Sequence, residues 1–211
     1  MPFCASGQGV RFNALAEEEG VVATGGRILP VLPDALRGAW RRHLEREVGG
    51  PTGRYAFGDR TRVIDAISEA PLPFGGNLGV LRSEALALGG FRPDLGFGGE
   101  LVPGEETALL LQLVDRGHVM YVGDAVMDHH VDAARLTRAY YRCWHRGYGR
   151  ALARMQPEQS VRMVLRGAWR PLLRALRNAD FHRVLRCLER TAGQCLELHA
   201  LHSRGLGQRS S

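Results

Sequence analysis

Residues 71–131 read PLPFGGNLGVLRSEALALGGFRPDLGFGGELVPGEETALLLQLVDRGHVMYVGDAVMDHHV, and no other part of the chain concentrates polar, potentially reactive residues in this way. It contains, in order, a Gly-Gly-Asn turn, a glycine-rich loop, two adjacent glutamates and two adjacent histidines. A stripe of leucines predicts a helix over residues 105–116, ended by Gly117. Apolar runs predict short buried strands over residues 119–122 and 125–127. Strands that alternate with helices in this way indicate a mixed α/β domain.

The composition predicts a folded chain with an uneven distribution of charge. With 211 residues, 45% of them hydrophobic, it can form one domain, or one domain with an appendage, around a buried core. Residues 135–211 hold 16 arginines and 4 acidic residues (net +12), whereas residues 1–134 hold 12 arginines and 18 acidic residues (net −6). We therefore expect an α/β domain over residues 1–134 and a basic α-helical extension over residues 135–211, packed on that domain. A basic extension suggests an anionic neighbour, such as lipid, nucleic acid, phosphate or a protein.

The cysteines and the chain start indicate a reducing compartment. The four cysteines form neither a CxxC pair nor a disulfide-like spacing, which predicts reduced thiols in a cytoplasmic protein. The first residues do not have the pattern of a secretory signal peptide. No apolar run approaches the roughly 20 residues that a membrane-spanning helix needs.

Glu105 and Glu106 are the first candidates for chemistry. Both lie in the first turn of the expected helix, where free backbone N–H groups and the helix dipole favour negative charge, so they can simply be helix-start residues. Glu106 also shares a helix face with Leu110 and Leu113, which directs its carboxylate towards the core side. A carboxylate held there can accept a proton from a substrate hydroxyl.

His129 and His130 follow the second expected strand. Strand alternation places His129 on the same face as Met127 and His130 on the opposite face with Val126, so only one histidine can face the same cavity as Glu106. A histidine at a strand end is usually structural, and two adjacent histidines do not by themselves make a metal site.

Gly75, Gly76 and Asn77 are the third candidate. Glycine residues expose backbone N–H groups that can cradle a phosphate, but the same residues can also form a tight turn and nothing more. The sequence here is neither a GxGxxG motif nor a P-loop.

Taken in order, these features resemble the second half of a family 2 glycosyltransferase with the GT-A fold, a Rossmann-like α/β architecture. The resemblance covers about residues 13–155. It rests on the following segments: Val22–Pro30, Gly76–Arg82, Gly89–Phe91 with the loop from Pro93 to Gly99, Gly104–Thr107, Tyr121–His129 and Arg135–Thr137.

The resemblance implies an inverting glycosyltransferase that moves a sugar from a nucleotide-sugar donor to an acceptor hydroxyl. Glu106 would be the general base, with Glu105 beside it. His129, or His130 as second choice, would help to hold Mn²⁺ or Mg²⁺ on the donor diphosphate. The acceptor would be a carbohydrate or a lipid-linked molecule of a cell-envelope polysaccharide. Residues expected near the sugars are Gly75, Gly76, Asn77, Gly99 and Glu100.

The sequence departs from the family pattern in one respect. It contains no Asp-x-Asp motif, and the nucleotide-binding strands that carry this motif in the family are not recognisable. We therefore expect a partial GT-A mixed sheet: a truncated enzyme, or one that needs a partner chain for the donor half.

The alternative hypothesis is a non-catalytic binding module derived from a glycosyltransferase, which contacts a membrane or a partner through its basic extension. The location expected for that contact is the inner face of the plasma membrane, where anionic lipid would meet the arginines. Nucleic acid is not expected as a partner, because no recognition motif accompanies the basic charge.

Overall fold

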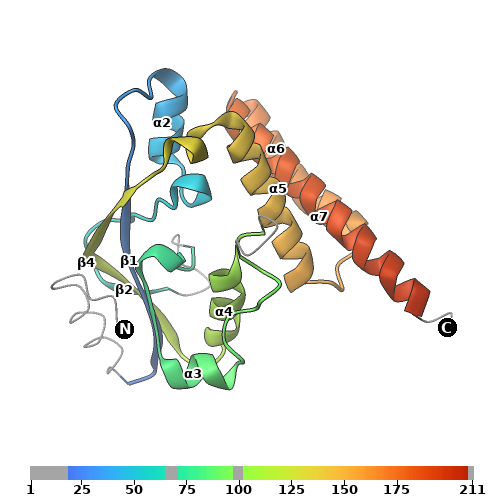
Figure 1. The fold of residues 1–211 in the computed structure, drawn as a ribbon, viewed down its shortest axis with the longest axis horizontal. Coiled ribbons are helices and arrows are strands. Elements are labelled where there is room, and N and C mark those ends of the chain that lie inside the picture. The colour runs from blue at the N-terminus through green and yellow to red at the C-terminus, as the bar shows by residue number, and fades with distance from the viewer. Residues whose placement is uncertain (1–18, 65–70, 97–101, 209–211) are drawn as a thin grey trace. The chain divides into compact units, whose positions relative to one another are not determined.

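The computed structural model describes residues 19–64, 71–96 and 102–208, and it shows the mixed α/β architecture that the sequence predicts (Figure 1). The chain forms two compact units. Unit 1 comprises Met1–Pro93 and Glu105–Arg135, and unit 2 comprises Asp94–Gly104 and Leu136–Ser211.

Unit 1 is built on a four-stranded mixed sheet in the order β2-β4-β1-β3. The strands are β1 (Val21–Val31), β2 (Arg62–Ile64), β3 (Leu78–Val80) and β4 (His118–His130). The two long strands, β1 and β4, lie side by side and parallel, whereas β3 pairs with β1 and β2 pairs with β4 in antiparallel fashion. The sheet is therefore centred on a parallel pair with a short antiparallel strand at each edge.

The prediction of two short strands over residues 119–122 and 125–127 is wrong in one respect, because both segments belong to the single strand β4. Its pairing with β1 jumps from Gly26↔Val122 to Arg27↔Val126, so residues 123–125 form a bulge. The side chain of Asn77 fills this irregularity: its Nδ2 donates to the carbonyl oxygens of Arg27 and Ala125, both at 2.9 Å. A side chain from another segment thus supplies hydrogen bonds to both strands at the irregularity.

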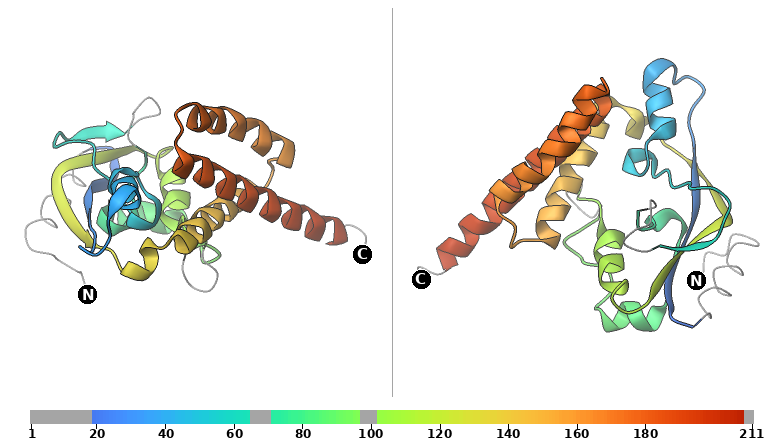
Figure 2. Two further views of the ribbon diagram at one scale, coloured as in Figure 1. Left: turned by 90° about the horizontal axis from the view of Figure 1, so that it is seen from above. Right: turned by 180° about the vertical axis from the view of Figure 1, so that it is seen from behind.

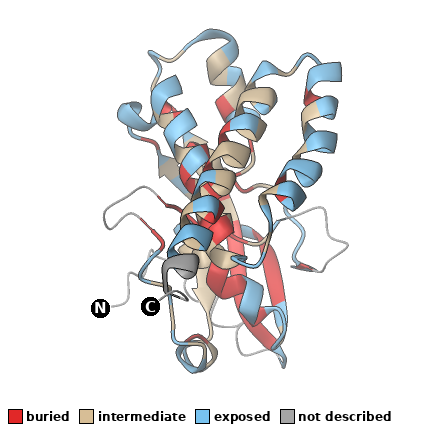
Figure 3. Ribbon diagram, turned by 90° about the vertical axis from the view of Figure 1, so that its right-hand side faces the viewer, coloured by how far each residue is buried: buried red, intermediate tan, exposed pale blue. Residues whose placement is uncertain are grey.

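In the described part of unit 1, three α-helices accompany the sheet: α2 (Gly38–Arg46), α3 (Arg82–Ala87) and α4 (Glu105–Leu113). Helix α4 ends earlier than the sequence suggests, and its buried Leu109, Leu110 and Leu113 join the core formed with the strands. Figure 3 shows buried residues concentrated along the strands. Short 3-10 turns η1 (Gly50–Thr52), η2 (Gly75–Asn77) and η3 (Ala133–Leu136) connect the elements.

Unit 2 contains the helices α5 (Arg138–Met155), α6 (Val161–Arg177) and α7 (Phe181–Gln208). Thr137 caps α5 and Ser160 caps α6, each accepting a hydrogen bond from the backbone N–H three residues ahead. Figure 2 shows α6 running beside α7. Among the described residues, no helix is both long and apolar enough to cross a bilayer.

Helices α5 and α7 approach each other closely at two glycines. A Cβ atom on Gly149 would overlap the carbonyl oxygen of Arg190, and a Cβ atom on Gly193 would overlap the carbonyl oxygen of Arg146. The two backbones are therefore in direct contact, which only glycine permits at these positions.

A ladder of ion pairs runs along the same helix pair. Arg142 and Arg146 bind the buried carboxylate of Glu189. Two further arginines of α5, Arg150 and Arg154, bind the half-buried carboxylate of Glu197. Burial alone would raise the pKa of both glutamates, but the hydrogen bonds and charges of the arginines outweigh it and hold each pKa below its ordinary value.

Acid should therefore weaken unit 2. A carboxyl whose pKa is lower in the folded state stabilises the fold above its unfolded pKa, and this stabilisation disappears as the pH falls through the folded pKa. We expect Glu189→Gln to cost about 1–2 kcal/mol at pH 7 and to make the urea midpoint of unit 2 less dependent on pH below pH 5. The exposed Glu158, replaced by Gln, is the control. An unchanged acid dependence in Glu189→Gln would contradict the role of the ladder.

Candidate functional site

The candidate site lies within unit 1, where turn η2 meets the start of α4. Glu106 is in the first turn of α4, and a Cβ atom placed on Gly75 would lie 4.0 Å from both Cβ and Cδ of Glu106. Gly75 has no side chain and is exposed, so the carboxyl group of Glu106 lies beside solvent-accessible backbone at the surface of unit 1. The fold thus brings together two elements that are about 30 residues apart in the sequence and that the resemblance groups in one site.

The surroundings of Glu106 raise the pKa of its carboxyl group. Burial is the main cause that raises the pKa of Glu106 above its ordinary value, and the charge of Glu105 adds to the rise. Hydrogen bonds from the backbone of Glu106 itself and of Gly75 act in the opposite direction. A carboxyl group whose pKa is raised towards neutrality is better suited to exchange protons with a substrate than an exposed glutamate.

Gly76 extends the site towards β4. A Cβ atom on Gly76 would lie 3.2 Å from Cε of Met127 and 3.3 Å from Cδ1 of Ile28, so the turn passes over this face of the sheet. His129 is two residues beyond Met127 on the same strand and therefore on the same face, roughly 7 Å further along. The two glycines of η2 thus lie between Glu106 on one side and the Met127 face of β4 on the other.

His129 is held in one orientation by the η1 turn. Its Nδ1 lies 2.8 Å from the carbonyl oxygen of Thr52. Because a carbonyl can only accept, Nδ1 carries the proton, and in the neutral ring Nε2 keeps a lone pair for another partner. Thr52 is fully buried, which fixes this contact. The sequence did not identify Thr52, since nothing in the Gly-Pro-Thr-Gly segment indicates which histidine its carbonyl meets.

Asn77 has a structural task in addition to any contact with a ligand. Both N–H bonds of its side-chain amide are directed at the carbonyls of Arg27 and Ala125, and the residue is buried. Only Oδ1 is left to meet a substrate. The predicted role of Asn77 near a sugar is therefore narrowed to that one atom.

The other predicted site residues are placed as follows. His130 is exposed and pairs with Val31, on the face of β4 opposite to His129. Glu105 is half-buried beside Glu106 in the first turn of α4. The predicted loop residues Gly99 and Glu100 lie outside the described residues.

The described residues do not by themselves fit a divalent metal ion. Among them, no group of three or more His, Cys, Asp or Glu side chains is placed to hold one. Mn²⁺ and Mg²⁺ prefer several oxygen ligands, and a single imidazole from His129 does not provide such a set.

Comparison with known proteins finds no match to this chain among family models, curated proteins or solved structures.

Proposed function

We propose that this protein is a glycosyltransferase of the inverting GT-A type, and that unit 1 provides the acceptor side of its active site. The observation that carries the proposal is the half-buried Glu106 carboxyl at the start of α4, set against the exposed backbone of Gly75 and with its pKa raised. The sequence resemblance assigns the general base to this same residue, and the position of Glu106 supports that assignment.

In the proposed reaction, the carboxylate of Glu106 accepts the proton of an acceptor hydroxyl. The hydroxyl oxygen then forms a bond to the anomeric carbon of a nucleotide sugar as the bond from that carbon to the diphosphate breaks. The nucleoside diphosphate leaves with the bonding electrons, and the configuration at the anomeric carbon is inverted. General-base assistance of this kind contributes about 10²–10⁴-fold to the rate.

The remaining residues have positioning roles in this proposal. The backbone of Gly75 and Gly76 lets a sugar ring approach closely, because no Cβ atom stands between Glu106 and the face of β4 that carries Met127. The Nδ1–H···O contact with Thr52 leaves Nε2 of His129 available to accept a hydrogen bond from the donor or the acceptor. The sequence has no Asp-x-Asp, and the described residues hold no group of three metal-ligating side chains, so a partner chain would be one source of carboxylates for a metal on the donor diphosphate.

The proposal is tested by incubating the purified chain with a panel of uridine, guanosine and thymidine diphosphate sugars and Mn²⁺. Release of nucleoside diphosphate, measured with and without simple sugar acceptors, is the expected result, together with heat of binding in calorimetry. The absence of both release and heat at millimolar donor would count against catalysis by this chain, and it would favour the binding-module hypothesis.

A further inference from the structure

Helix α6 of unit 2 has an exposed apolar row in addition to its buried face. The row has helical spacings of four, four and three residues and consists of Leu165, Trp169, Leu173 and Leu176. Trp169 is 60% exposed and Leu165 is 55% exposed. Large apolar side chains exposed singly are ordinary, but four in a row along one helix form a continuous apolar surface.

This row does not belong to the core of unit 2. The core side of α6 is a different face, on which Val164 packs with Leu198 of α7 and Ala153 of α5. Val164 and Ala175 are the buried residues of α6. The helix therefore already has a buried face, and the exposed row is an additional apolar surface.

A row of arginines runs parallel to the apolar row. Every member of the apolar row is followed at once by an arginine, so the second row is displaced by about 100° around the helix; its members are Arg166, Arg170, Arg174 and Arg177. With Arg162, helix α6 carries five arginines, and its sequence contains no acidic residue.

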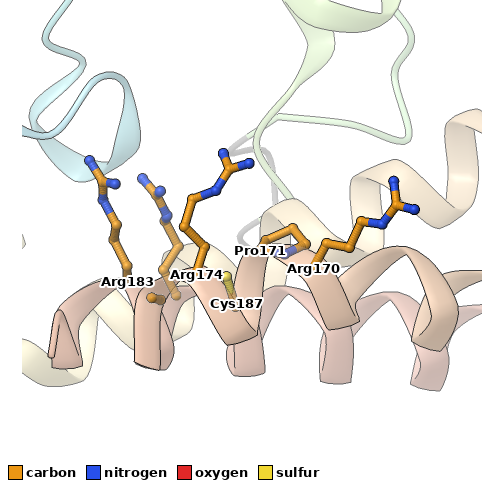
Figure 4. Close-up of a pocket in the computed structure, with 7 residues that line it drawn as sticks. Arg170, Pro171, Arg174, Arg183 and Cys187 are labelled. Carbon is orange, nitrogen blue, oxygen red and sulfur yellow. The ribbon is translucent and has the colours of Figure 1, made fainter. Parts of the chain in front are cut away.

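The arginine row continues onto α7 through an open pocket (Figure 4). Arg170 and Arg174 of α6 line this pocket with Arg183 and Arg186 of α7, and its volume is about 250 Å³. None of the described residues that line it is acidic. Asp180, at the start of α7, pairs with Arg183 at 3.1 Å and offsets part of the charge. Figure 4 shows the side chains of Arg170, Arg174 and Arg183 extending away from the two helices in the same general direction.

We propose that α6, together with the first turns of α7, docks on the surface of a bilayer that contains anionic phospholipid. The apolar row, with Trp169, enters the boundary between head groups and acyl chains. The arginine row and the pocket bind lipid phosphates, since guanidinium groups bind phosphate with two parallel hydrogen bonds. A helix with an apolar face, an arginine-rich flank and no acidic residue has the composition of an interfacial helix.

The apolar row decides between lipid and nucleic acid as the partner. A nucleic acid would neutralise the arginines but would leave the side chains of Leu165 and Leu176 in water. A bilayer surface satisfies both rows, because arginine side chains reach from an apolar boundary to the phosphates above it. The inference depends only on α6 and α7, so it holds or fails independently of the role of Glu106.

The test measures flotation of the full chain with vesicles of phosphatidylcholine alone or mixed with phosphatidylglycerol. We expect binding only to the anionic vesicles, and a blue shift of tryptophan fluorescence that is lost in Trp169→Ser. Arg170→Gln/Arg174→Gln should lower the partition coefficient about 25-fold, roughly fivefold for each charge near the surface. Leu165→Ser should weaken binding several-fold through lost apolar burial.

Matched controls are available in unit 1. Arg42→Gln/Arg60→Gln removes the same charge from exposed positions, and Leu86→Ser alters a leucine that is 59% exposed, close to Leu165. Both should bind as the wild type does, and circular dichroism checks the fold of every variant. The proposal is overturned by equal binding to neutral and anionic vesicles, or by no binding. It is also overturned if millimolar inorganic phosphate abolishes vesicle binding while Leu165→Ser binds vesicles as tightly as the wild type does. Tighter binding of single-stranded RNA than of the vesicles would overturn it as well.

Discussion

Glu106→Gln is expected to lower the rate of nucleoside diphosphate release in the presence of acceptor by about 10²–10⁴-fold, the usual contribution of a general base. The amide keeps the shape of the side chain but cannot accept a proton from a hydroxyl. Glu106→Asp keeps the acid but withdraws it by one methylene, and an intermediate rate is expected because displacement of about 1 Å is costly for proton transfer in a fixed geometry. The measurement is a coupled assay for the released diphosphate at saturating donor.

The matching control is Asp115→Asn, which removes one negative charge from an exposed position just after α4. It should leave the rate unchanged. Retention of wild-type activity by Glu106→Gln would remove this residue from the mechanism, whatever its position in the fold.

The pH dependence separates a catalytic role of Glu106 from a structural one. Because burial raises the folded pKa of Glu106, the ionised base forms only as the pH rises through a value above 4.5, and the rate should rise over the same range. A raised carboxyl pKa also means that ionised Glu106 opposes folding at neutral pH, so Glu106→Gln should be as stable as the wild type or more stable. A clear loss of stability in Glu106→Gln at pH 7 would instead indicate a structural role. Carbon-13 NMR of the carboxyl group gives its pKa directly, without any substrate.

Gly193→Ala should destabilise unit 2 by about 3 kcal/mol, at the upper end of the usual cost of overpacking. The added methyl group would overlap the carbonyl oxygen of Arg146, and backbone cannot move aside as a flexible side chain can. Helices α5 and α7 would have to separate, which would also disturb the ion pairs of Glu189 and Glu197. Faster hydrogen exchange throughout α5 and α7 is the expected observation.

Gly167→Ala is the internal control for this change. Gly167 lies in α6, and nothing lies within 4 Å of the position that its Cβ atom would take. Alanine there should stabilise the helix by about 1 kcal/mol, through helix propensity alone. If both substitutions had the same effect, the close approach of α5 and α7 would be refuted.

Local patterns in the sequence were sufficient for several features. The leucine stripe of α4 places Glu106 above buried residues, and the two-residue period of β4 separates the exposed His130 from the half-buried His129. These features depend on residues only a few positions apart, so local sequence patterns are enough to predict them.

Features that depend on distant partners could not be predicted. The sequence pattern predicts two strands in place of the single β4, because the bulge between them is bridged by Asn77, which lies 48 residues before Ala125. The orientation of His129 depends on the Thr52 carbonyl, which is 77 residues away. From the sequence alone, Gly193 is only a residue of low helix propensity. Its role in the close approach of two helices follows from the Arg146 carbonyl oxygen that lies against it. In each case the contact that determines the feature joins residues that are far apart in the sequence, so a pattern of neighbouring residues cannot indicate it.

The central parallel pair has a consequence for how the chain is made. Val21 of β1 pairs with His118 of β4, so the sheet cannot close until nearly 100 further residues have been synthesised. During that interval the edge of β1 that pairs with β4 has unpaired backbone groups, whereas the ion pairs of Glu189 join α5 and α7 across only 43–47 residues. At about 5–20 residues per second, the edge of β1 that pairs with β4 stays open for on the order of 5–20 seconds, long enough for chaperones or neighbouring chains to compete for it. Synthesis yield should therefore depend more on the length and solubility of the segment between β1 and β4 than on the helices of unit 2.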